Sequence, residues 1–471
     1  MNILLINPMF TMYGGVKGHG GSSPPLNLGY LAAYVRSQNP HYTLSILDAE
    51  ALQLTYEEIA QHIRRIRPDV VGMTANTPAF HHVVTISELC KSLDKTIRIV
   101  VGGPHPSGLP EETVTIAAID YVVVGEGEKT FEELLRVIET DGDLDSVDGI
   151  LYKNNGRIVR NQSRLLIEDL DSLPFPARDL MPHHLYTPAP TKRVSNFHAT
   201  SICSARGCPF SCTFCGANLI WGKKYRYRSP SNVIAEIEQC MEMDIREFNF
   251  TDELFTANRE RLRQLCEEII RKDLHIAFTC MSRVGDFVDD EILLLMKQAG
   301  CKQISFGIES GSQDVLDLMN KKITLNAARN SIKHVKKTGI KTHASYMIGN
   351  IGDTRETIQA TIEFAKELDT DIAAFFVTSP LPGTALWHQA KSQGYVRQDF
   401  EWIDFSPLSK ASSPVLNLPS LSSQEIKYWH SRAIRDYYLR PHYIIKRLRG
   451  LRSWVELKNL LNGLKLFFRL Q

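Results

Sequence analysis

Short apolar segments alternate with helical ones in two successive series, and this alternation limits the possible folds more than any other feature. In the first series the apolar segments are residues 2–7, 43–48, 69–74, 98–103 and 121–125. Apolar residues recur at helical spacing in residues 28–37, 56–65, 81–93, 111–118 and 129–139. Strands that are apolar throughout are buried on both faces, so we predict a doubly wound parallel sheet of the α/β class.

The second series begins near residue 198. Its apolar segments are residues 199–203, 247–251, 276–280, 303–307, 341–347 and 372–379, separated by helical segments such as 231–241, 259–272, 290–298, 325–338 and 354–368. Six β/α units predict a partial (β/α)6 barrel of the TIM type, in which chemistry is placed at the carboxyl ends of the strands.

Between the two series lie a turn signal and a stretch rich in proline. Asn154, Asn155 and Gly156 separate two short strand-like runs and predict a hairpin, and five prolines follow between residues 169 and 190. We therefore expect domains at residues 1–145 and 193–400, a hairpin and linker at 146–192, and a C-terminal helical region at 401–471.

Charge and composition exclude several classes of protein. The net charge of +1 gives no overall attraction to nucleic acid. Nine cysteines without a secretory signal indicate a reducing compartment, where thiols bind metals more often than they form disulfides. The sequence contains no run of about 18 apolar residues, so we predict no membrane span and expect a cytoplasmic protein.

Three cysteines, Cys208, Cys212 and Cys215, stand at the spacing C-x3-C-x2-C. Thiolates ligate iron, and a [4Fe–4S] cluster held by three of them keeps one iron open to a small molecule. A structural zinc site is an alternative, but it needs a fourth ligand, and none follows within the next dozen residues. Cys203 lies upstream in a predicted strand. The remaining alternative is three buried thiols without a metal.

This loop resembles the signature of the radical S-adenosylmethionine (SAM) superfamily. The sequence around it is similar to the branch with an N-terminal, Rossmann-like cobalamin (vitamin B12)-binding domain, and the resemblance covers almost the whole chain. It implies three cofactors, namely a [4Fe–4S] cluster, SAM and cobalamin, with Cys208, Cys212 and Cys215 as the cluster ligands. It also implies a reducing electron donor of the flavodoxin or ferredoxin type.

Glu309 is the most informative residue after the cysteines. It follows an apolar strand between Gly307 and Gly311, where a carboxylate can accept ribose hydroxyls or cap a helix. The resemblance implies a SAM site made of Phe214, Ser282, Arg283, Gly307, Glu309, Ser310, Gly349 and Gly352. Arg283 is equally compatible with a surface ion pair.

The cobalamin site is expected at the carboxyl ends of the first series of strands. The resemblance implies contacts from Pro25, Leu26, Gly72, Thr74, Gly103, His105, Gly125 and Glu126, although each glycine alone fits an ordinary turn. The Asp-x-His-x-x-Gly signature is absent, so His105 is not expected to ligate cobalt. The corrin would be held by shape and backbone contacts, and the loop of residues 14–21 would lie near the same edge.

The resemblance implies reductive cleavage of SAM and C-methylation of a natural product, a lipid or a tetrapyrrole-type substrate. An oxidoreductase or cyclase using the same cofactors is the alternative within this branch. A non-catalytic iron–sulfur or corrin-binding sensor is an alternative from another class. Six polar strand ends that converge on one barrel mouth favour catalysis over sensing.

The C-terminus is strongly basic. From residue 427 to residue 471 there are eleven Lys and Arg against two acidic residues, a net charge of +9 in a chain whose total is +1. Residues 422–439 and 454–470 are predicted helices, and Pro441 is expected to break the first. Basic and apolar residues at helical spacing indicate either an interfacial membrane helix or a helix packed on the barrel.

Overall fold

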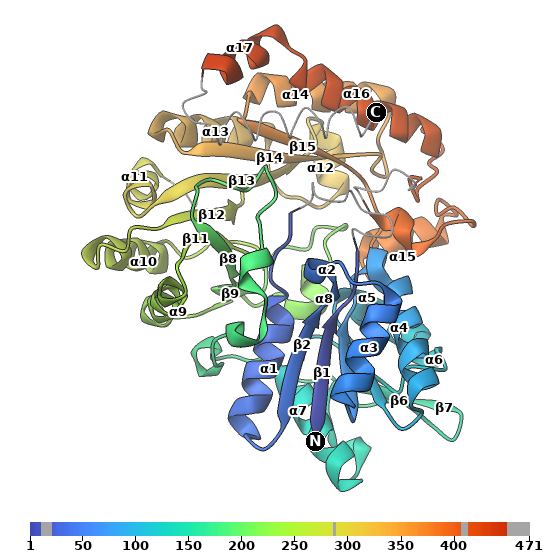
Figure 1. The fold of residues 1–471 in the computed structure, drawn as a ribbon. Coiled ribbons are helices and arrows are strands. Elements are labelled where there is room, and N and C mark those ends of the chain that lie inside the picture. Colours follow the sequence, from blue (N-terminus) through green and yellow to red (C-terminus); the bar gives the residue numbers. More distant parts are fainter. Residues whose placement is uncertain (11–20, 286–288, 407–412, 450–471) are drawn as a thin grey trace.

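A computed structural model of the chain describes residues 1–10, 21–285, 289–406 and 413–449. Figure 1 shows two sheets, a blue one near the N-terminus and a green-to-orange one above it, with the last helices across the top. Both predicted series of alternating strands and helices are therefore present, and we call each sheet with its helices a layer. The boundaries between the four expected regions stay a prediction.

The N-terminal sheet has seven strands in the order β2-β1-β3-β4-β5-β6-β7. They are β1 (Asn2–Asn7), β2 (Thr43–Asp48), β3 (Val70–Thr74), β4 (Arg98–Gly102), β5 (Tyr121–Val123), β6 (Ile150–Asn154) and β7 (Arg157–Arg160). The first five are parallel. The order 2-1-3-4-5 confirms the doubly wound sheet, and it places a topological switch point between β1 and β3.

Helices cover both faces of this sheet. They are α1 (Leu26–Gln38), α2 (Ala49–Leu52), α3 (Tyr56–Ile66), α4 (Phe80–Leu93), α5 (Pro104–Gly108), α6 (Pro110–Thr115) and α7 (Glu128–Thr140). In β1, Ile3 and Leu5 are buried in the core with α1 and α7, whereas Leu4 and Ile6 are buried in the core with α3 and α4. Burial of alternate residues on both faces explains why the strands read as continuous apolar runs.

The predicted hairpin is present as β6 and β7, and it extends the N-terminal sheet. β6 pairs antiparallel with β5, so the hairpin forms the edge of the sheet. The proline-rich segment continues from it through three short 3-10 turns, Leu170–Ser172, Arg178–Leu180 and His183–Leu185. Arg178 fixes this segment to the second layer, because its guanidinium donates to the buried carboxylate of Glu236 at 2.5 Å.

The second sheet contains six parallel strands in chain order, as a partial barrel requires. They are β8 (His198–Ile202), β11 (Ile245–Phe250), β12 (Ala277–Ser282), β13 (Cys301–Glu309), β14 (Lys341–Ile348) and β15 (Ile372–Val377). The covering helices are α9 (Pro230–Glu242), α10 (Arg259–Arg271), α11 (Asp290–Gln298), α13 (Leu325–Thr338) and α14 (Arg355–Leu368). Shorter elements lie between them, namely β9 (Ala205–Arg206), α8 (Ala217–Trp221), β10 (Arg226–Tyr227), α12 (Gln313–Leu318) and α15 (Ala385–Ser392).

Two C-terminal helices, α16 (Ser423–Tyr438) and α17 (Pro441–Arg449), pack on the barrel. The hydroxyls of Tyr437, Tyr438 and Tyr443 donate to backbone carbonyls of residues 370–373, at or beside the start of β15, at 2.5–2.9 Å. Pro441 ends the first helix as predicted, but it also starts α17, because the first helical position does not need an N–H. The predicted helix 454–470 lies outside the described residues.

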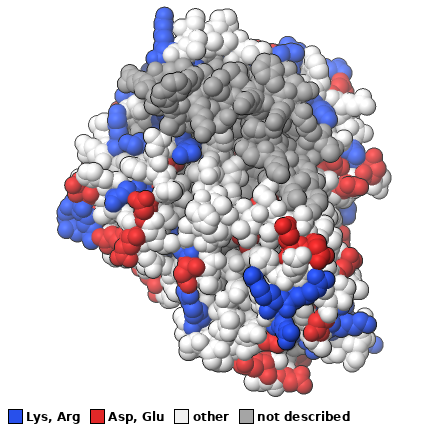
Figure 2. Space-filling view, viewed as in Figure 1, with Lys and Arg blue, Asp and Glu red and all other residues white. Residues whose placement is uncertain are grey.

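The described surface carries charge of both signs. On the face in Figure 2, Lys and Arg side chains lie among Asp and Glu, as the near-zero net charge predicts. None of the helices in the described part of the chain combines the length and the apolar character that crossing a bilayer requires.

The turn after β13 packs tightly on α14, which gives a test of the fold. A Cβ atom at Gly311 would lie 2.6 Å from the carbonyl oxygen of Ala360 and 2.7 Å from the Cβ of Phe364. We expect Gly311→Ala to lower the free energy of unfolding by about 1–3 kcal/mol, as overpacking does. Thermal unfolding followed by circular dichroism measures this. Gly102→Ala is the control, since its nearest neighbour would be 3.5 Å away; equal effects of the two substitutions would contradict the prediction.

Candidate active site and adjoining cavity

The cysteine loop follows β8 and β9 at the carboxyl edge of the barrel. Later barrel segments hold its backbone: the amide of Thr213 donates to the carbonyl of Met319, and its carbonyl accepts from the amide of Leu386, both at 2.9 Å. The side-chain amide of Asn320 donates to the carbonyl of Ser211 at 2.8 Å. The loop is therefore positioned by elements that follow it by more than 100 residues.

The thiols of Cys208, Cys212 and Cys215 form no disulfide. Burial raises the pKa of Cys208 and Cys215, while the charges of Arg283 and Lys321 act in the opposite direction. In the described part of the chain, no three His, Cys, Asp or Glu side chains form a group that could hold a single metal ion. Three soft donors on one short loop with cations beside them fit the thiolate ligands of an iron–sulfur cluster.

Glu309 ends β13 in an unusual backbone conformation. Its φ of 69° is left-handed, and the register with β14 shifts between Gly307 and Glu309. Such irregularities re-aim a side chain and often occur beside active sites. The carboxylate is buried and accepts from the ammonium group of Lys321 at 2.9 Å. A Cβ at Gly307 would lie 2.3 Å from the same carboxylate, so only glycine leaves room for it there.

Lys321 connects Glu309 to the cysteine loop. Its ammonium group lies 5.6 Å from the ring centroid of Phe214, the aromatic residue between the last two cysteines. The structure thus brings Phe214 and Glu309 together, as predicted, through a lysine that the sequence analysis did not identify. The sequence shows a lysine shortly after the Gly-Ile-Glu-Ser-Gly stretch, but its position alone does not distinguish it from exposed lysines nearby.

Ser282 and Arg283 also lie at this edge. The guanidinium of Arg283 is 3.6 Å from the centroid of the Phe210 ring, in the cysteine loop, and it donates to the carbonyl of Lys322 at 3.1 Å. Arg283 is buried, so the alternative of a surface ion pair is not what the structure shows. The hydroxyl of Ser282 hydrogen-bonds to that of Thr256 at 2.7 Å.

Three other predicted residues shape the neighbouring turns. The hydroxyl of Ser310 lies 3.2 Å from that of Thr361 on α14. Gly349 and Gly352 have φ values of 86° and 94° in the turn between β14 and α14. A Cβ at Gly349 would lie 2.8 Å from the side chain of Ile426, and one at Gly352 would lie 2.3 Å from that of Leu318. The amide of Gly349 donates to the buried carboxylate of Asp353 at 3.1 Å.

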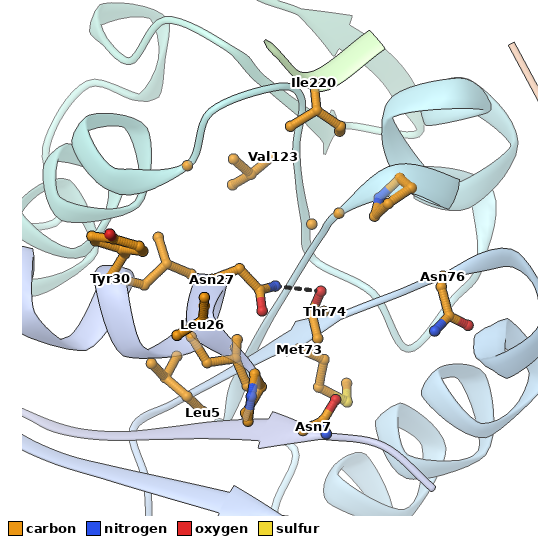
Figure 3. Close-up of a pocket in the computed structure, with 18 of the residues that line it drawn as sticks. Leu5, Asn7, Leu26, Asn27, Tyr30, Met73, Thr74, Asn76, Val123 and Ile220 are labelled. Carbon is orange, nitrogen blue, oxygen red and sulfur yellow. Dashed lines mark hydrogen bonds between the residues drawn. The ribbon is translucent and has the colours of Figure 1, made fainter. Parts of the chain in front are cut away.

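A cavity of about 700 Å³ lies at the carboxyl edge of the N-terminal sheet. Figure 3 shows Leu5 and Asn7 from β1 beside Met73 and Thr74 from β3, so the cavity lies at the switch point of the sheet. The side chain of Asn27 donates to the hydroxyl of Thr74 at 2.7 Å across this wall. Seven predicted cobalamin contacts line the cavity: Pro25, Leu26, Gly72, Thr74, Gly103, Gly125 and Glu126.

The barrel completes the other wall of this cavity. Its contribution comes from residues that flank the cysteine loop or end β11: Cys203, Arg206, Ile220, Trp221, Thr251 and Glu253. Burial raises the pKa of Glu253 to about 7. The cavity therefore joins the carboxyl edges of the two sheets, a relation that neither half of the sequence reveals by itself.

The lining suits a large, flat ligand held by backbone. Gly103 and Gly125, with φ values of 103° and 78°, present main chain without side chains at the ends of β4 and β5. Among the described residues that line the cavity there is no histidine. The predicted glycine loop, residues 14–21, lies almost wholly outside the described residues; Gly21 lines the cavity.

His105 is the one predicted cobalamin residue that the structure does not bring into this cavity. Its ring is buried and stacks on Phe80, with 3.8 Å between centroids, and meets the edge of Trp402. Its Nε2 has no hydrogen-bond partner among the described residues. Burial lowers the pKa of His105 to about 3, so the imidazole is a neutral core group.

Glu126 lines the cavity, but its carboxylate is already engaged. It accepts from the guanidinium groups of Arg206 at 3.1 Å and Arg226 at 2.9 Å, and from the amide of Ile167 at 2.8 Å. The structure therefore gives Glu126 a partner on the barrel side.

Comparison with known proteins agrees with this geometry. A model of the radical SAM superfamily matches residues 202–365, and a model of the B12 binding domain matches residues 17–135. An uncharacterized methyltransferase of Pyrococcus horikoshii, PH0819, is 35% identical over 448 residues, which are 95% of this chain and 94% of that protein. The chain belongs to the radical SAM superfamily.

Within the superfamily it falls in the cobalamin-dependent branch, as its sequence predicted, and the predicted cofactors are those of this branch. The anaerobic magnesium-protoporphyrin IX monomethyl ester cyclase of Rubrivivax gelatinosus is 32% identical over 87% of this chain and 74% of its own length. The fold matches that of the radical SAM methyltransferase TsrM from Kitasatospora setae, solved with cobalamin and a [4Fe–4S] cluster, with a TM-score of 0.70 and 18% identity over 94% of this chain and 89% of that one.

The buried imidazole of His105 gives a pH-dependent prediction. In the unfolded chain it takes up a proton near pH 6.5, but in the folded chain only near pH 3. The unfolded state therefore gains stability as the pH falls through this range, at about 1.4 kcal/mol per pH unit. We expect His105→Phe to lose less stability than the wild type between pH 7 and pH 5, by about 2 kcal/mol or less.

Urea unfolding at the two pH values measures this difference. His275→Phe, at an exposed histidine, controls for the change of ring. If His105→Phe and the wild type lost stability equally on acidification, the assignment of a neutral core imidazole would be wrong.

Proposed function

We propose that this radical SAM enzyme is a cobalamin-dependent C-methyltransferase. The observation that carries the proposal is the shared cavity: its floor is the edge of the B12-binding sheet, and its other wall is formed by the residues around the cysteine loop. The proposed cobalamin site therefore adjoins the segments that flank the cysteine loop. The relative of P. horikoshii named as a methyltransferase supports the same reaction.

In this proposal Cys208, Cys212 and Cys215 hold the [4Fe–4S] cluster. When bound, the cluster, SAM and cobalamin supply reductive cleavage of a sulfonium, hydrogen abstraction from carbon and methyl transfer. The protein fixes the loop through Thr213 and Asn320 and keeps cations beside the thiolates. An electron donor of the flavodoxin or ferredoxin type would supply the reducing equivalent.

SAM would be held between the cysteine loop and the ends of β12, β13 and β14. Glu309 would accept the ribose hydroxyls, and Lys321 would keep its carboxylate oriented. Phe214 would lie by the adenine, and Ser282 and Arg283 by the methionine carboxylate. Gly307, Ser310, Gly349 and Gly352 support these positions through the close packing of their turns.

Cobalamin would occupy the cavity at the switch point of the N-terminal sheet. Pro25, Leu26, Gly72, Thr74, Gly103 and Gly125 would contact it mainly through carbon atoms and backbone. Because the described lining has no histidine, no imidazole from this wall would ligate cobalt. Apolar walls from β1, β3 and α1 would exclude water from the reaction.

The second candidate reaction is ring closure or oxidation with the same cofactors, supported by the relative named as a cyclase. A sensor without catalysis is disfavoured, because polar residues stand at or just after the ends of four barrel strands: Glu253, Ser282, Glu309 and Asn350. The proposed substrate is a small molecule, namely a natural product, a lipid or a tetrapyrrole.

Alanine substitution tests the cluster ligands. We expect Cys208→Ala, Cys212→Ala and Cys215→Ala each to lose the brown colour of the reconstituted cluster. We also expect SAM cleavage to 5′-deoxyadenosine under dithionite to fall by at least 100-fold, since the cluster would lack a ligand. Cys266→Ala is the control, because Cys266 is buried on α10, outside both the loop and the cavity lining. Retention of colour and cleavage in all three variants would overturn the proposal.

The reaction type is tested with SAM carrying a deuterated methyl group, added with dithionite and a metabolite extract to the fully loaded enzyme. Methyl transfer predicts a product that carries the label, together with both S-adenosylhomocysteine and 5′-deoxyadenosine. A cyclase or oxidoreductase would give 5′-deoxyadenosine and an unlabelled product.

A lipid substrate would favour contact with a membrane surface, which we propose for α17. Leu439, Ile444, Ile445 and Leu448 are exposed on or beside this helix, near the basic end of the chain. Two basic residues of this region, Arg440 and Lys446, pack on the barrel instead, where they pair with Asp369. We expect co-sedimentation with anionic vesicles at low salt, and a loss of at least fivefold for Ile445→Glu with Leu448→Glu. Vesicles of neutral lipid are the control; no sedimentation with either would contradict this contact.

A further inference from the structure

Four buried charges join the two sheets beside the cavity. Arg206 donates to Glu126 at 3.1 Å and to Glu128 at 2.6 Å, and Arg226 donates to both oxygens of Glu126 at 2.9 and 3.0 Å. The two arginines are paired residues of β9 and β10. Glu126 lies in the turn between β5 and α7, and Glu128 is the first residue of α7. These side chains are 2–6% exposed.

Backbone groups and aromatic rings hold the network on the side away from the cavity. The amide of Ile167 donates to Glu126, and the second guanidinium nitrogen of Arg226 donates to the carbonyl of Trp221. The guanidinium of Arg206 lies 4.6 Å from the ring of Trp221 and 5.3 Å from the ring of Tyr30. Tyr30, Trp221, Arg206 and both glutamates line the cavity, so a ligand there would touch this network.

The network also adjoins the cysteine loop. Arg206 precedes Cys208 by two residues. Gly207, between them, is closely packed, because a Cβ there would lie 2.1 Å from the carbonyl oxygen of Lys224. The amide of Cys208 donates to the carbonyl of Gly222 at 3.3 Å, within the same short segment that carries Trp221. A shift of the turn that carries Glu128 must therefore move Arg206 and, with it, the start of the loop.

We propose that Arg206 is a positioning residue that couples the two cofactor sites, so that cobalamin in the cavity and the cluster on the cysteine loop each strengthen the binding of the other. The inference rests on the proposed function for the identity of these ligands. Coupling between two sites is reciprocal, and values of about 5- to 150-fold in affinity are typical. The turn of Glu126 and Glu128 carries the effect from the cavity wall to Arg206, and Gly207 carries it to Cys208.

Equilibrium binding of hydroxocobalamin, followed by absorbance, tests the coupling. The Kd is measured for the full-length chain with and without a reconstituted cluster. We expect the cluster-loaded wild type to bind at least fivefold more tightly than the cluster-free protein. In Arg206→Gln this ratio should fall toward one, because the variant removes the cation that joins Glu126 and Glu128 to the start of the cysteine loop. Iron content of each sample is determined in parallel.

Lys91→Gln is the matched control. Lys91 pairs with Asp120 at 2.7 Å in the same N-terminal layer, but at the amino-terminal edge of the strands and outside the cavity lining. The ratio of the Kd without a cluster to the Kd with a cluster should be the same in Lys91→Gln as in the wild type. A wild-type ratio of one, with both cofactors bound, would overturn the coupling and leave the proposed function intact. Failure of the wild type to bind hydroxocobalamin or to form a cluster would overturn both. A wild-type ratio of at least five that is unchanged in folded Arg206→Gln would overturn the role of Arg206. Circular dichroism shows whether the variant is folded.

Discussion

Two parallel sheets in this protein face each other through their carboxyl edges, and buried charge holds those edges together. Arg206 and Arg226 on the barrel side meet Glu126 and Glu128 on the other. Removing one partner of such a buried pair typically costs about 3–5 kcal/mol, although an apolar contact of the same size would stabilise as well. Directional ion pairs fix a geometry that apolar packing would leave adjustable, and this geometry defines the cavity.

The same principle appears within the barrel. Glu309 occupies a left-handed conformation at a register shift, and Lys321 compensates its buried charge. Gly307 makes the space for this pair. Strained backbone of this kind persists only where the surroundings determine it fully, and here the surroundings are the cysteine loop on one side and β14 on the other. The carboxylate of Glu309 is therefore positioned by contacts within the protein itself.

Much of this arrangement was predictable. The apolar runs gave the positions of all five parallel strands in the first sheet and all six in the second, because strands buried on both faces cannot be mistaken for amphipathic ones. The hairpin was predicted too, but its place at the edge of the first sheet was not, since pairing between distant strands leaves no local pattern. His105 likewise lies in a stretch that resembles a ligand site, but its ring packs against Phe80 and Trp402 in the core, which the sequence did not predict.

The sequence by itself determined the two layers, the family and the three cysteines, because periodicity and short spacings are local properties of a chain. Only the tertiary structure decided that one cavity lies between the layers, that Lys321 accompanies Glu309, and that Glu126 binds arginines. These facts depend on residues 12 to 100 positions apart. Charge compensation in a dry interior requires partners to meet in space, and no local pattern specifies which ones will meet.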